Sequence, residues 1–151
     1  MSAAEPGARG DDAESYARAL RTVLDTESER VAAALGDLHR AAVEAENGVE
    51  AILIDVFVDQ DGEGPFDVWA RFEGADAFAL DRRLDEQRHL FGVEWTADGW
   101  EPSVPSRPRR WMRDRLEEAV LVVVAEWIEG LLPADAREGL FWVGAPDLGY
   151  A

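Results

Sequence analysis

The stretch from residue 49 to residue 72, VEAILIDVFVDQDGEGPFDVWARF, constrains the fold more than any other part of the chain. Two apolar runs flank a turn rich in Asp and Gly, which predicts a β-hairpin. Apolar residues at the even positions from Ile52 to Val58 share one face of the first strand, predicted over 51–59. In the return strand, apolar residues alternate with Asp67, Trp69 and Arg71. Because a lone hairpin is marginally stable in water, we expect helices to cover it.

Two long helices are predicted to provide that cover. Over residues 12–46, apolar residues recur at helical spacing, and Asn47-Gly48 is a typical stop signal. A second helix is predicted over 108–131, with Pro108 in its first turn and Gly130 near its end. Residues 1–11 combine small residues with Pro and Gly and show no periodicity, so we expect a disordered leader.

The remaining segments complete an α+β prediction. A short helix is expected over 80–89, and a second hairpin with its turn at 97–99 follows. An edge strand is expected over 140–143. Residues 12–151 therefore predict a single α+β domain, in which an antiparallel sheet built from the two hairpins is covered by the two long helices.

Composition excludes several classes of function. The chain has no Cys and no Lys, so disulfides, thiolate nucleophiles and Schiff bases on lysine are absent. It carries 32 acidic and 15 basic residues, a net charge of −17. This charge opposes binding to nucleic acid and to anionic membranes, and it fits either a highly solvated surface or a basic partner. The N-terminus does not resemble a signal peptide, and no apolar run approaches the roughly 20 residues of a membrane span, so we expect a cytoplasmic protein.

Two partial metal motifs are present. Residues 59–64, DQDGEG, match the first half of a calcium-binding EF-hand loop, but Ala70 stands where the loop needs a bidentate Glu. Glu86-x-x-His89 is half of a di-iron motif, and no second copy is found. No nucleophile or nucleotide-binding motif occurs either. We therefore expect no metal, no cofactor and no catalytic residues, and an enzyme is the less favoured class.

Arginines gather ahead of and within the start of the last predicted helix: Arg107, Arg109, Arg110, Arg113 and Arg115. One interpretation is internal pairing at i,i+4 spacing, as in Arg110–Asp114 and Arg113–Glu117. The other is a site for an anion or a partner, in which Trp111 adds a stacking surface.

Tryptophans supply a second group of candidates. Trp69 shares a strand face with Arg71, while Trp95 and Trp100 flank the turn of the second hairpin. If they are exposed together they form a binding surface, because Trp and Arg dominate interaction hot spots. The alternative is that Trp69 and Trp95 cover the second face of the sheet.

Three phrases, DQDGEGPFDVWARFEG, FALDRRLDEQRHLFGV and VPSRPRRWMRDRLEEAV, together resemble an uncharacterised family of short acidic proteins from high-GC actinobacteria. The resemblance extends from about Tyr16 to Leu132. It implies a bacterial cytoplasmic origin and supplies no activity, cofactor or site residue.

These features predict a non-enzymatic protein-interaction module, of inhibitor or immunity type, that binds a basic protein. The alternative is a protein or enzyme that binds an anionic small molecule in a pocket lined by Trp and Arg between sheet and helices. A homodimer is compatible with both. The candidate binding residues are those introduced above: Trp69, Arg71, Trp95, Trp100, Arg107, Arg109, Arg110, Trp111 and Arg113.

Overall fold

The computed structural model describes residues 4–146 and 148–150 and has an α+β fold with a mainly antiparallel sheet. The predicted α+β class is thus confirmed. The helices of the described residues are α1 (Ala4–Asp25), α2 (Ser28–Glu44), α3 (Ala77–Arg83), α4 (Asp85–Arg88) and α5 (Arg113–Leu131). The strands are β1 (Ala51–Val58), β2 (Phe66–Glu73), β3 (His89–Phe91), β4 (Glu94–Thr96), β5 (Gly99–Glu101), β6 (Phe141–Ala145) and β7 (Gly149–Tyr150).

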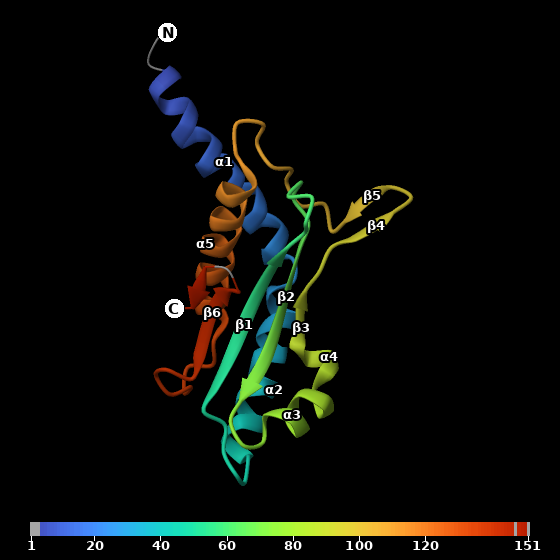
Figure 1. Cartoon of the computed structure of the whole chain (residues 1–151), viewed down its shortest axis with the longest axis vertical. Coiled ribbons are helices and arrows are strands. Elements are labelled where there is room, and N and C mark those ends of the chain that lie inside the picture. The colour runs from blue at the N-terminus through green and yellow to red at the C-terminus, as the bar shows by residue number, and fades with distance from the viewer. Residues whose placement is uncertain (1–3, 147, 151) are drawn as a thin grey trace.

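The main sheet has five strands in the order β3-β2-β1-β6-β7 (Figure 1). The predicted first hairpin is present as β1 and β2, paired antiparallel from Ala51 opposite Glu73 to Val58 opposite Phe66. The strand predicted over 140–143 is β6, but it is not at an edge: it pairs with β1 in parallel, and β7 adds to its other side. The sheet therefore joins the middle of the chain to its last residues.

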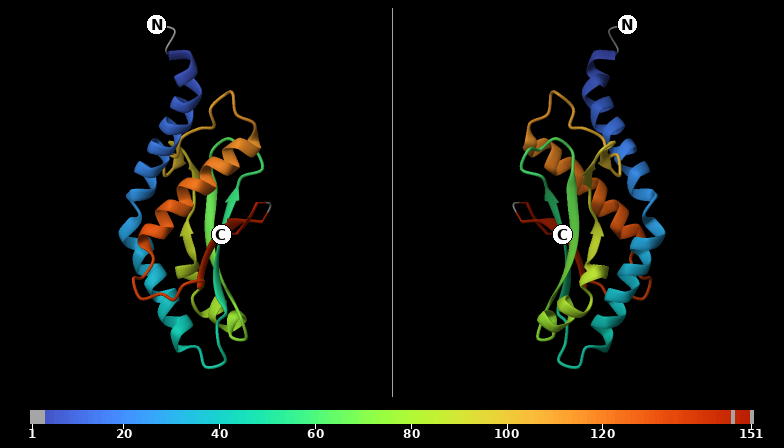
Figure 2. Two further views of the ribbon diagram at one scale, coloured as in Figure 1. Left: turned by 90° about the vertical axis from the view of Figure 1, so that its left-hand side faces the viewer. Right: turned by 90° about the vertical axis from the view of Figure 1, so that its right-hand side faces the viewer.

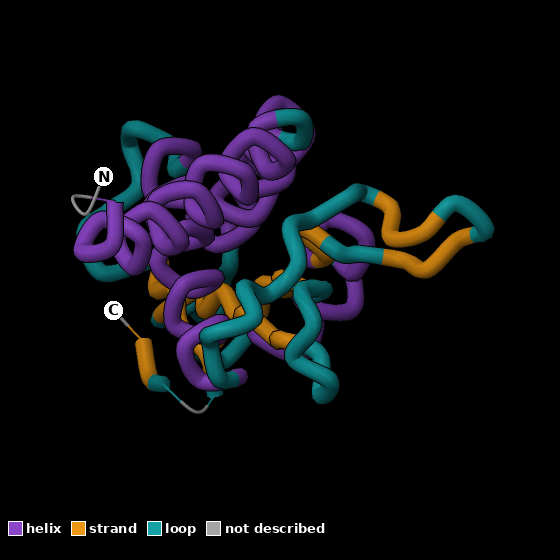
Figure 3. The backbone as a smooth tube through the Cα atoms, turned by 90° about the horizontal axis from the view of Figure 1, so that it is seen from above, coloured by secondary structure: helices purple, strands orange, loops and turns teal. Residues whose placement is uncertain are grey.

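The second predicted hairpin forms, as β4 and β5, but it makes a separate two-stranded sheet. Figure 3 shows it projecting from the body of the molecule. This differs from the prediction of one sheet built from two hairpins. The physical reason is that β4 and β5 are only three residues long and bury no side chain fully; of their residues, Trp100 packs partly against the core.

The helix predicted over 12–46 is two helices in the structure. The chain turns at Thr26, whose hydroxyl donates a hydrogen bond of 2.7 Å to the Val23 carbonyl oxygen and so competes with the helical ladder. Of the predicted leader, residues 1–3 lie outside the described residues, and α1 begins at Ala4. Figure 2 shows α1 and α2 as one curved column, with α5 crossing at an angle. Three long helices, instead of two, thus surround the core.

The core lies between these helices and one face of the sheet. The even-numbered residues of β1 and of β2 are buried there, against residues of α2 and α5 such as Leu35, Leu38, Val124 and Trp127. The Trp127 indole N–H donates to the Ser28 hydroxyl at 2.9 Å, so even the polar atom of this buried ring has a partner. None of the helices in the described part of the chain has both the length and the apolar composition needed to cross a bilayer.

The opposite face of the sheet is not covered in the same way. In Figure 1, β1 and β2 lie in front of α2, and no helix of the described residues lies in front of them. We call this side the open face. It is formed by the odd-numbered residues of β1 and β2 together with side chains of the three other strands: Leu53, Asp55, Phe57, Asp67, Trp69, Arg71, Glu73, His89, Trp142 and Tyr150.

Candidate functional site

The register of the sheet aligns one residue from each strand across the open face. Trp69 of β2 lies opposite Asp55 of β1 on one side and His89 of β3 on the other. Asp55 pairs with Gly144 of β6, and Gly144 in turn pairs with Tyr150 of β7. Because paired residues of neighbouring strands point to the same side of a sheet, this row is a continuous strip of side chains. We take it as the centre of the candidate site.

Asp55 is the buried charge of this row, and Arg71 and Tyr150 hold it. The Arg71 Nε atom lies 2.8 Å from the Asp55 Oδ2 atom, and the Tyr150 hydroxyl donates a hydrogen bond to the other carboxylate oxygen. Arg71 also approaches the Tyr150 oxygen at 3.4 Å and the Glu73 carboxylate at 3.2 Å. A buried carboxylate needs such partners, because removing a charge from water without them is costly.

The same contacts change the pKa values of Arg71 and Tyr150. Burial lowers the pKa of the Arg71 guanidinium, but its hydrogen bonds to Tyr150 and Asp55 more than offset this, so the net shift is upward. Burial raises the pKa of the Tyr150 hydroxyl; the hydrogen bond to Asp55 raises it further, and Arg71 acts in the opposite direction. Around neutral pH, Arg71 is therefore a fixed cation and Tyr150 a neutral donor.

Gly144 allows Tyr150 to reach Asp55. A Cβ atom at position 144 would lie 2.4 Å from the Tyr150 ring and 2.2 Å from the Gly149 carbonyl oxygen. Only a residue without a side chain lets β7 pack this closely. The last strand and the buried carboxylate are thus coupled through one glycine.

An aromatic stack forms the other end of the row. The Trp69 and His89 rings are 4.4 Å apart with an interplanar angle of 14°, and the Arg88 guanidinium lies 5.7 Å from the Trp69 ring centre. The His89 Nε2 atom is 3.4 Å from the Asp67 carboxylate. These contacts fix the orientation of the Trp69 ring on the open face, where the ring stays partly accessible.

Exposed apolar side chains lie beside the row. Phe57 is 43% exposed and Trp142 is 38% exposed, and both are on the open face. Trp142 is level with Leu53, and its indole N–H donates to the Gly139 carbonyl oxygen at 2.8 Å. A solvated face that exposes large apolar side chains between charged ones is typical of an interaction surface.

Carboxylates gather where this face meets the β1–β2 turn. Burial, followed by the charges of Asp67 and Asp61, raises the pKa of Asp59 above its ordinary value. Asp59 thus has two acidic neighbours at this turn, where Arg107 and Arg113 also donate to the Gly62 and Val58 carbonyl oxygens.

The structure does not bring the predicted site residues together in one place. Trp69 and Arg71 lie on the open face, whereas Trp95 and Trp100 pair across the separate hairpin, where Trp95 is 76% exposed. Trp111 is buried, with its ring centre 5.2 Å from that of Tyr16. The candidates thus divide among the open face, the projecting hairpin and the core.

The predicted arginine cluster divides as well. Arg107 donates to the carbonyl oxygens of Gly62, at 2.9 Å, and of Trp111, and so ties the first hairpin to the segment before α5. Arg113 donates to the Val58 carbonyl oxygen at 3.2 Å and lies 3.9 Å from Glu117, the pair that the i,i+4 spacing predicted. Arg109 and Arg110 are exposed.

Sequence reasoning did not select three residues of the site: Asp55, His89 and Tyr150. A signal existed for Asp55, because a charge within the apolar run AILIDVFV needs a buried partner. No comparable signal existed for Tyr150, which lies in a polar tail and joins the site only through β7.

Of five cavities in the described structure, none is lined by Asp55, Trp69 or Arg71, and one is lined by His89 at the end of the row. The fold and this site define a small α+β protein with a sheet covered by helices on one face and a polar, aromatic surface on the other.

The chain belongs to a family of unknown function, DUF6389, whose family model matches residues 11–151. No curated protein and no solved structure is significantly similar to the chain. The predicted membership of an uncharacterised family is thereby confirmed.

Proposed function

We propose that this protein is a cytoplasmic, non-enzymatic interaction module of actinobacteria that binds a basic protein through its open face. The observation that carries the proposal is the composition of that face: exposed Phe57 and Trp142 lie beside the Asp55–Arg71 pair, without a covering helix in the described residues. Aromatic side chains and arginine are the residue types that contribute most to protein interfaces.

The shape of the open face supports a protein partner. Small molecules bind in concave pockets, which bury most of their surface, whereas a protein can cover a flat sheet face. A flat face with aromatic anchors and a charged rim has the general anatomy of a protein interface.

Charge supports a basic partner in particular. The chain carries −17 overall, and three of its acids, Asp59, Asp61 and Asp67, lie near one another at one end of the open face. A positively charged partner would be attracted by this net charge and would associate faster at low ionic strength. An inhibitor or immunity-type protein is one kind of module that acts in this way.

The alternative, an anionic ligand held between sheet and helices, has less support. That space is occupied by large buried side chains, among them Trp127, Phe66 and Phe91. The Trp and Arg residues that were expected to line such a pocket lie elsewhere, as Trp69 and Arg71 do on the open face.

The test is an affinity capture with matched surface variants. The tagged protein and the double variant Phe57→Ser/Trp142→Ser are incubated with lysate of the source organism at low and at high salt. The control is Phe78→Ser, which removes an aromatic side chain that is 75% exposed on α3, away from the open face. We expect a stoichiometric basic protein to bind the wild type and the control, to be lost at high salt, and not to bind the double variant.

Two results would contradict the proposal. One is the absence of any stoichiometric partner at low salt. The other is a partner that binds the open-face variant as well as it binds the wild type, since its contact surface would then lie elsewhere. Circular dichroism on each variant establishes that a loss of binding does not reflect unfolding.

A further inference from the structure

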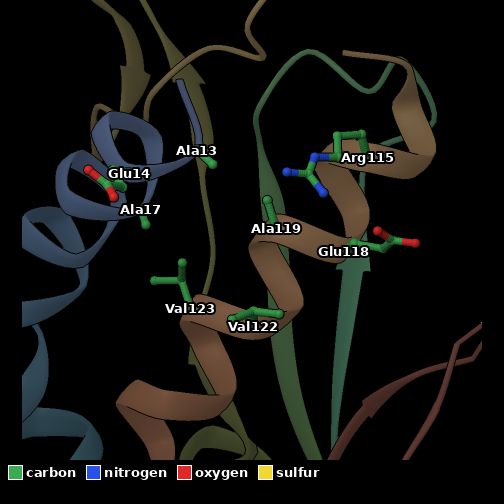
Figure 4. Close-up of a pocket in the computed structure, with 8 residues that line it drawn as sticks. All are labelled: Ala13, Glu14, Ala17, Arg115, Glu118, Ala119, Val122 and Val123. Atoms are coloured by element: carbon green, nitrogen blue, oxygen red, sulfur yellow. The ribbon is translucent and has the colours of Figure 1, made fainter. Parts of the chain in front are cut away.

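A second surface of the molecule, independent of the open face, has the properties of a ligand site. Helices α1 and α5 pack against each other and leave an apolar groove of about 330 Å³ between them (Figure 4). We call it the α1/α5 groove. Its volume lies within the range of small-molecule sites. It is lined by Ala13, Glu14, Ala17, Arg115, Glu118, Ala119, Val122 and Val123.

The groove exists because its walls are made of short apolar side chains. Ala13 and Ala17 on α1 face Ala119 on α5, so the two helices meet without filling the space between them. Val122 is 55% exposed, although it is a β-branched apolar residue on the most apolar helix of the chain. Exposed apolar surface that is concave and has a charged rim is typical of a binding site.

Arg115 is the charged group that faces this apolar surface. In Figure 4 its guanidinium points across the groove toward α1, whereas the carboxylate of Glu118 points away from α1. The guanidinium carbon lies 5.3 Å from the centre of the Trp111 ring. Among residues 12–146 and 148–150, whose side chains the structure describes, no carboxylate forms an ion pair with Arg115.

Arg115 is exposed, so its donors can meet a ligand. The contact with Trp111 uses the face of the guanidinium, and the N–H groups at its edge have no ion-pair partner among the residues whose side chains are described. A guanidinium binds a carboxylate through two parallel hydrogen bonds, with both geometric and electrostatic selectivity. The groove therefore combines an apolar channel with a fixed cation at one side.

We propose that the α1/α5 groove binds the carboxylate form of an aliphatic fatty acid. The carboxylate pairs with Arg115, and the hydrocarbon chain lies along Ala13, Ala17 and Val122. A basic amphipathic helix also suits an apolar groove on an acidic protein, and Glu14 and Glu118 lie at the rim of this one. In Figure 4, however, the Glu14 carboxylate points away from α5 and the Glu118 carboxylate away from α1, so the charge aimed into the groove is that of Arg115, which repels such a helix. The geometry thus favours an anionic amphiphile.

The experiment is a titration of the full chain with sodium laurate below its critical micelle concentration, followed by NMR of alanine methyl groups. We expect saturable shifts of the Ala13, Ala17 and Ala119 signals. Arg115→Gln is expected to weaken binding about tenfold or more, because it removes a charge-assisted contact. Val122→Asp is expected to weaken it similarly by placing a negative charge beside the ligand at an exposed position, where substitution is compatible with folding.

The matched control is Arg110→Gln, which removes an exposed arginine that does not line the groove and is expected to leave the affinity unchanged within about twofold. Dodecyltrimethylammonium, which has a chain of equal length and the opposite charge, is expected to bind at least about tenfold more weakly than laurate. Circular dichroism of every variant verifies the fold.

Three outcomes would overturn the inference. Non-saturable methyl shifts would mean that laurate acts as a detergent. Equal binding to the wild type and to Arg115→Gln, or equal binding of the ammonium amphiphile, would remove the role of the guanidinium. Saturation of the same methyl signals by a Leu/Lys amphipathic peptide, but not by laurate, would assign the groove to a helix instead.

Discussion

Asp55 and Arg71 form an ion pair on the open face of the sheet, in which the Arg71 Nε atom lies 2.8 Å from the Asp55 Oδ2 atom. The two partners differ in environment, because the Asp55 side chain is almost fully buried and that of Arg71 is partly exposed. The pair therefore has an asymmetric role: Arg71 compensates a charge that the fold has removed from water.

Removing Arg71 is expected to destabilise the protein. Arg71→Gln leaves Asp55 buried without its cation, and we expect the free energy of unfolding to fall by about 2–3 kcal/mol, less than for a fully buried pair. Urea unfolding measures the change. Arg40→Gln, which removes a surface partner of Asp37 at 3.5 Å, serves as the control and should cost less than about 0.5 kcal/mol. Equal losses in the two variants would show that Asp55 does not depend on Arg71.

Alkaline pH is expected to destabilise the fold through Tyr16. Burial raises the pKa of its hydroxyl above the ordinary value of 10.0, and the hydroxyl has no hydrogen-bond partner in the described structure. The folded state thus favours the neutral form, while the unfolded chain ionises near pH 10. The stabilisation is complete below pH 10 and is lost as the pH rises beyond it.

The variant Tyr16→Phe tests this dependence. It should show a smaller loss of unfolding free energy above pH 10, and at pH 7 it should be equally stable or up to about 1 kcal/mol more stable, because an unpaired hydroxyl has been removed. Tyr150→Phe is the contrasting variant: it loses the hydrogen bond to Asp55 and should cost about 1 kcal/mol at pH 7. An unchanged alkaline slope in Tyr16→Phe would contradict the assignment.

Gly144→Ala is expected to detach β7. The added Cβ atom would meet the Gly149 carbonyl oxygen at 2.2 Å, a backbone atom that can move only if the strand moves. We expect the free energy of unfolding to fall by about 1–3 kcal/mol. Amide hydrogen exchange should become faster in β6 and β7 and should change little in β2. Exchange that is unchanged at residues 144–150 would mean that β7 tolerates the methyl group.

Gly36→Ala is expected to stabilise α2. A Cβ atom at position 36 would meet nothing within 4 Å, and Gly is less favourable than Ala within a helix by up to about 1 kcal/mol. Thermal unfolding should therefore show a higher midpoint. Gly74→Ala provides the opposite case, because Gly74 has a φ of +128° and its Cβ atom would lie 2.8 Å from the Glu50 nitrogen; this variant should be less stable.

The parts of the fold that local patterns encode were predictable. The alternation in β1 and β2 and the Gly-containing turns place both hairpins, and the helical spacing from Tyr16 to Leu38 identifies the buried residues of α1 and α2. The predicted start of the last helix, at Pro108, was wrong. Pro108 is a typical first-turn residue, but the chain stays non-helical until Arg113, where α5 begins. The break at Thr26 depends on one side-chain hydrogen bond, which periodicity does not reveal.

The candidate site was predictable only in part, since it depends on pairing between distant strands. Trp69 and Arg71 follow from the strand pattern of β2. Their neighbours Asp55, His89 and Tyr150 come from three other strands, and the parallel pairing of β6 with β1 has no local signal. Trp111, which was selected for its arginine neighbours, is instead a core residue packed on Tyr16.

The row across the open face has a consequence for the order of events during folding. Its contact between Tyr150 and Asp55 joins residues 95 positions apart, whereas the two strands of the first hairpin pair residues no more than 22 positions apart, from Ala51 opposite Glu73 to Val58 opposite Phe66. Contacts of such long range slow folding, because a large loop must close before they form. A chain emerging during synthesis can form α2 and the first hairpin early, but it completes the open face only after β6 and β7 have been made. Any partner that recognises this row would therefore distinguish molecules in which these two strands are in place from molecules in which they are not.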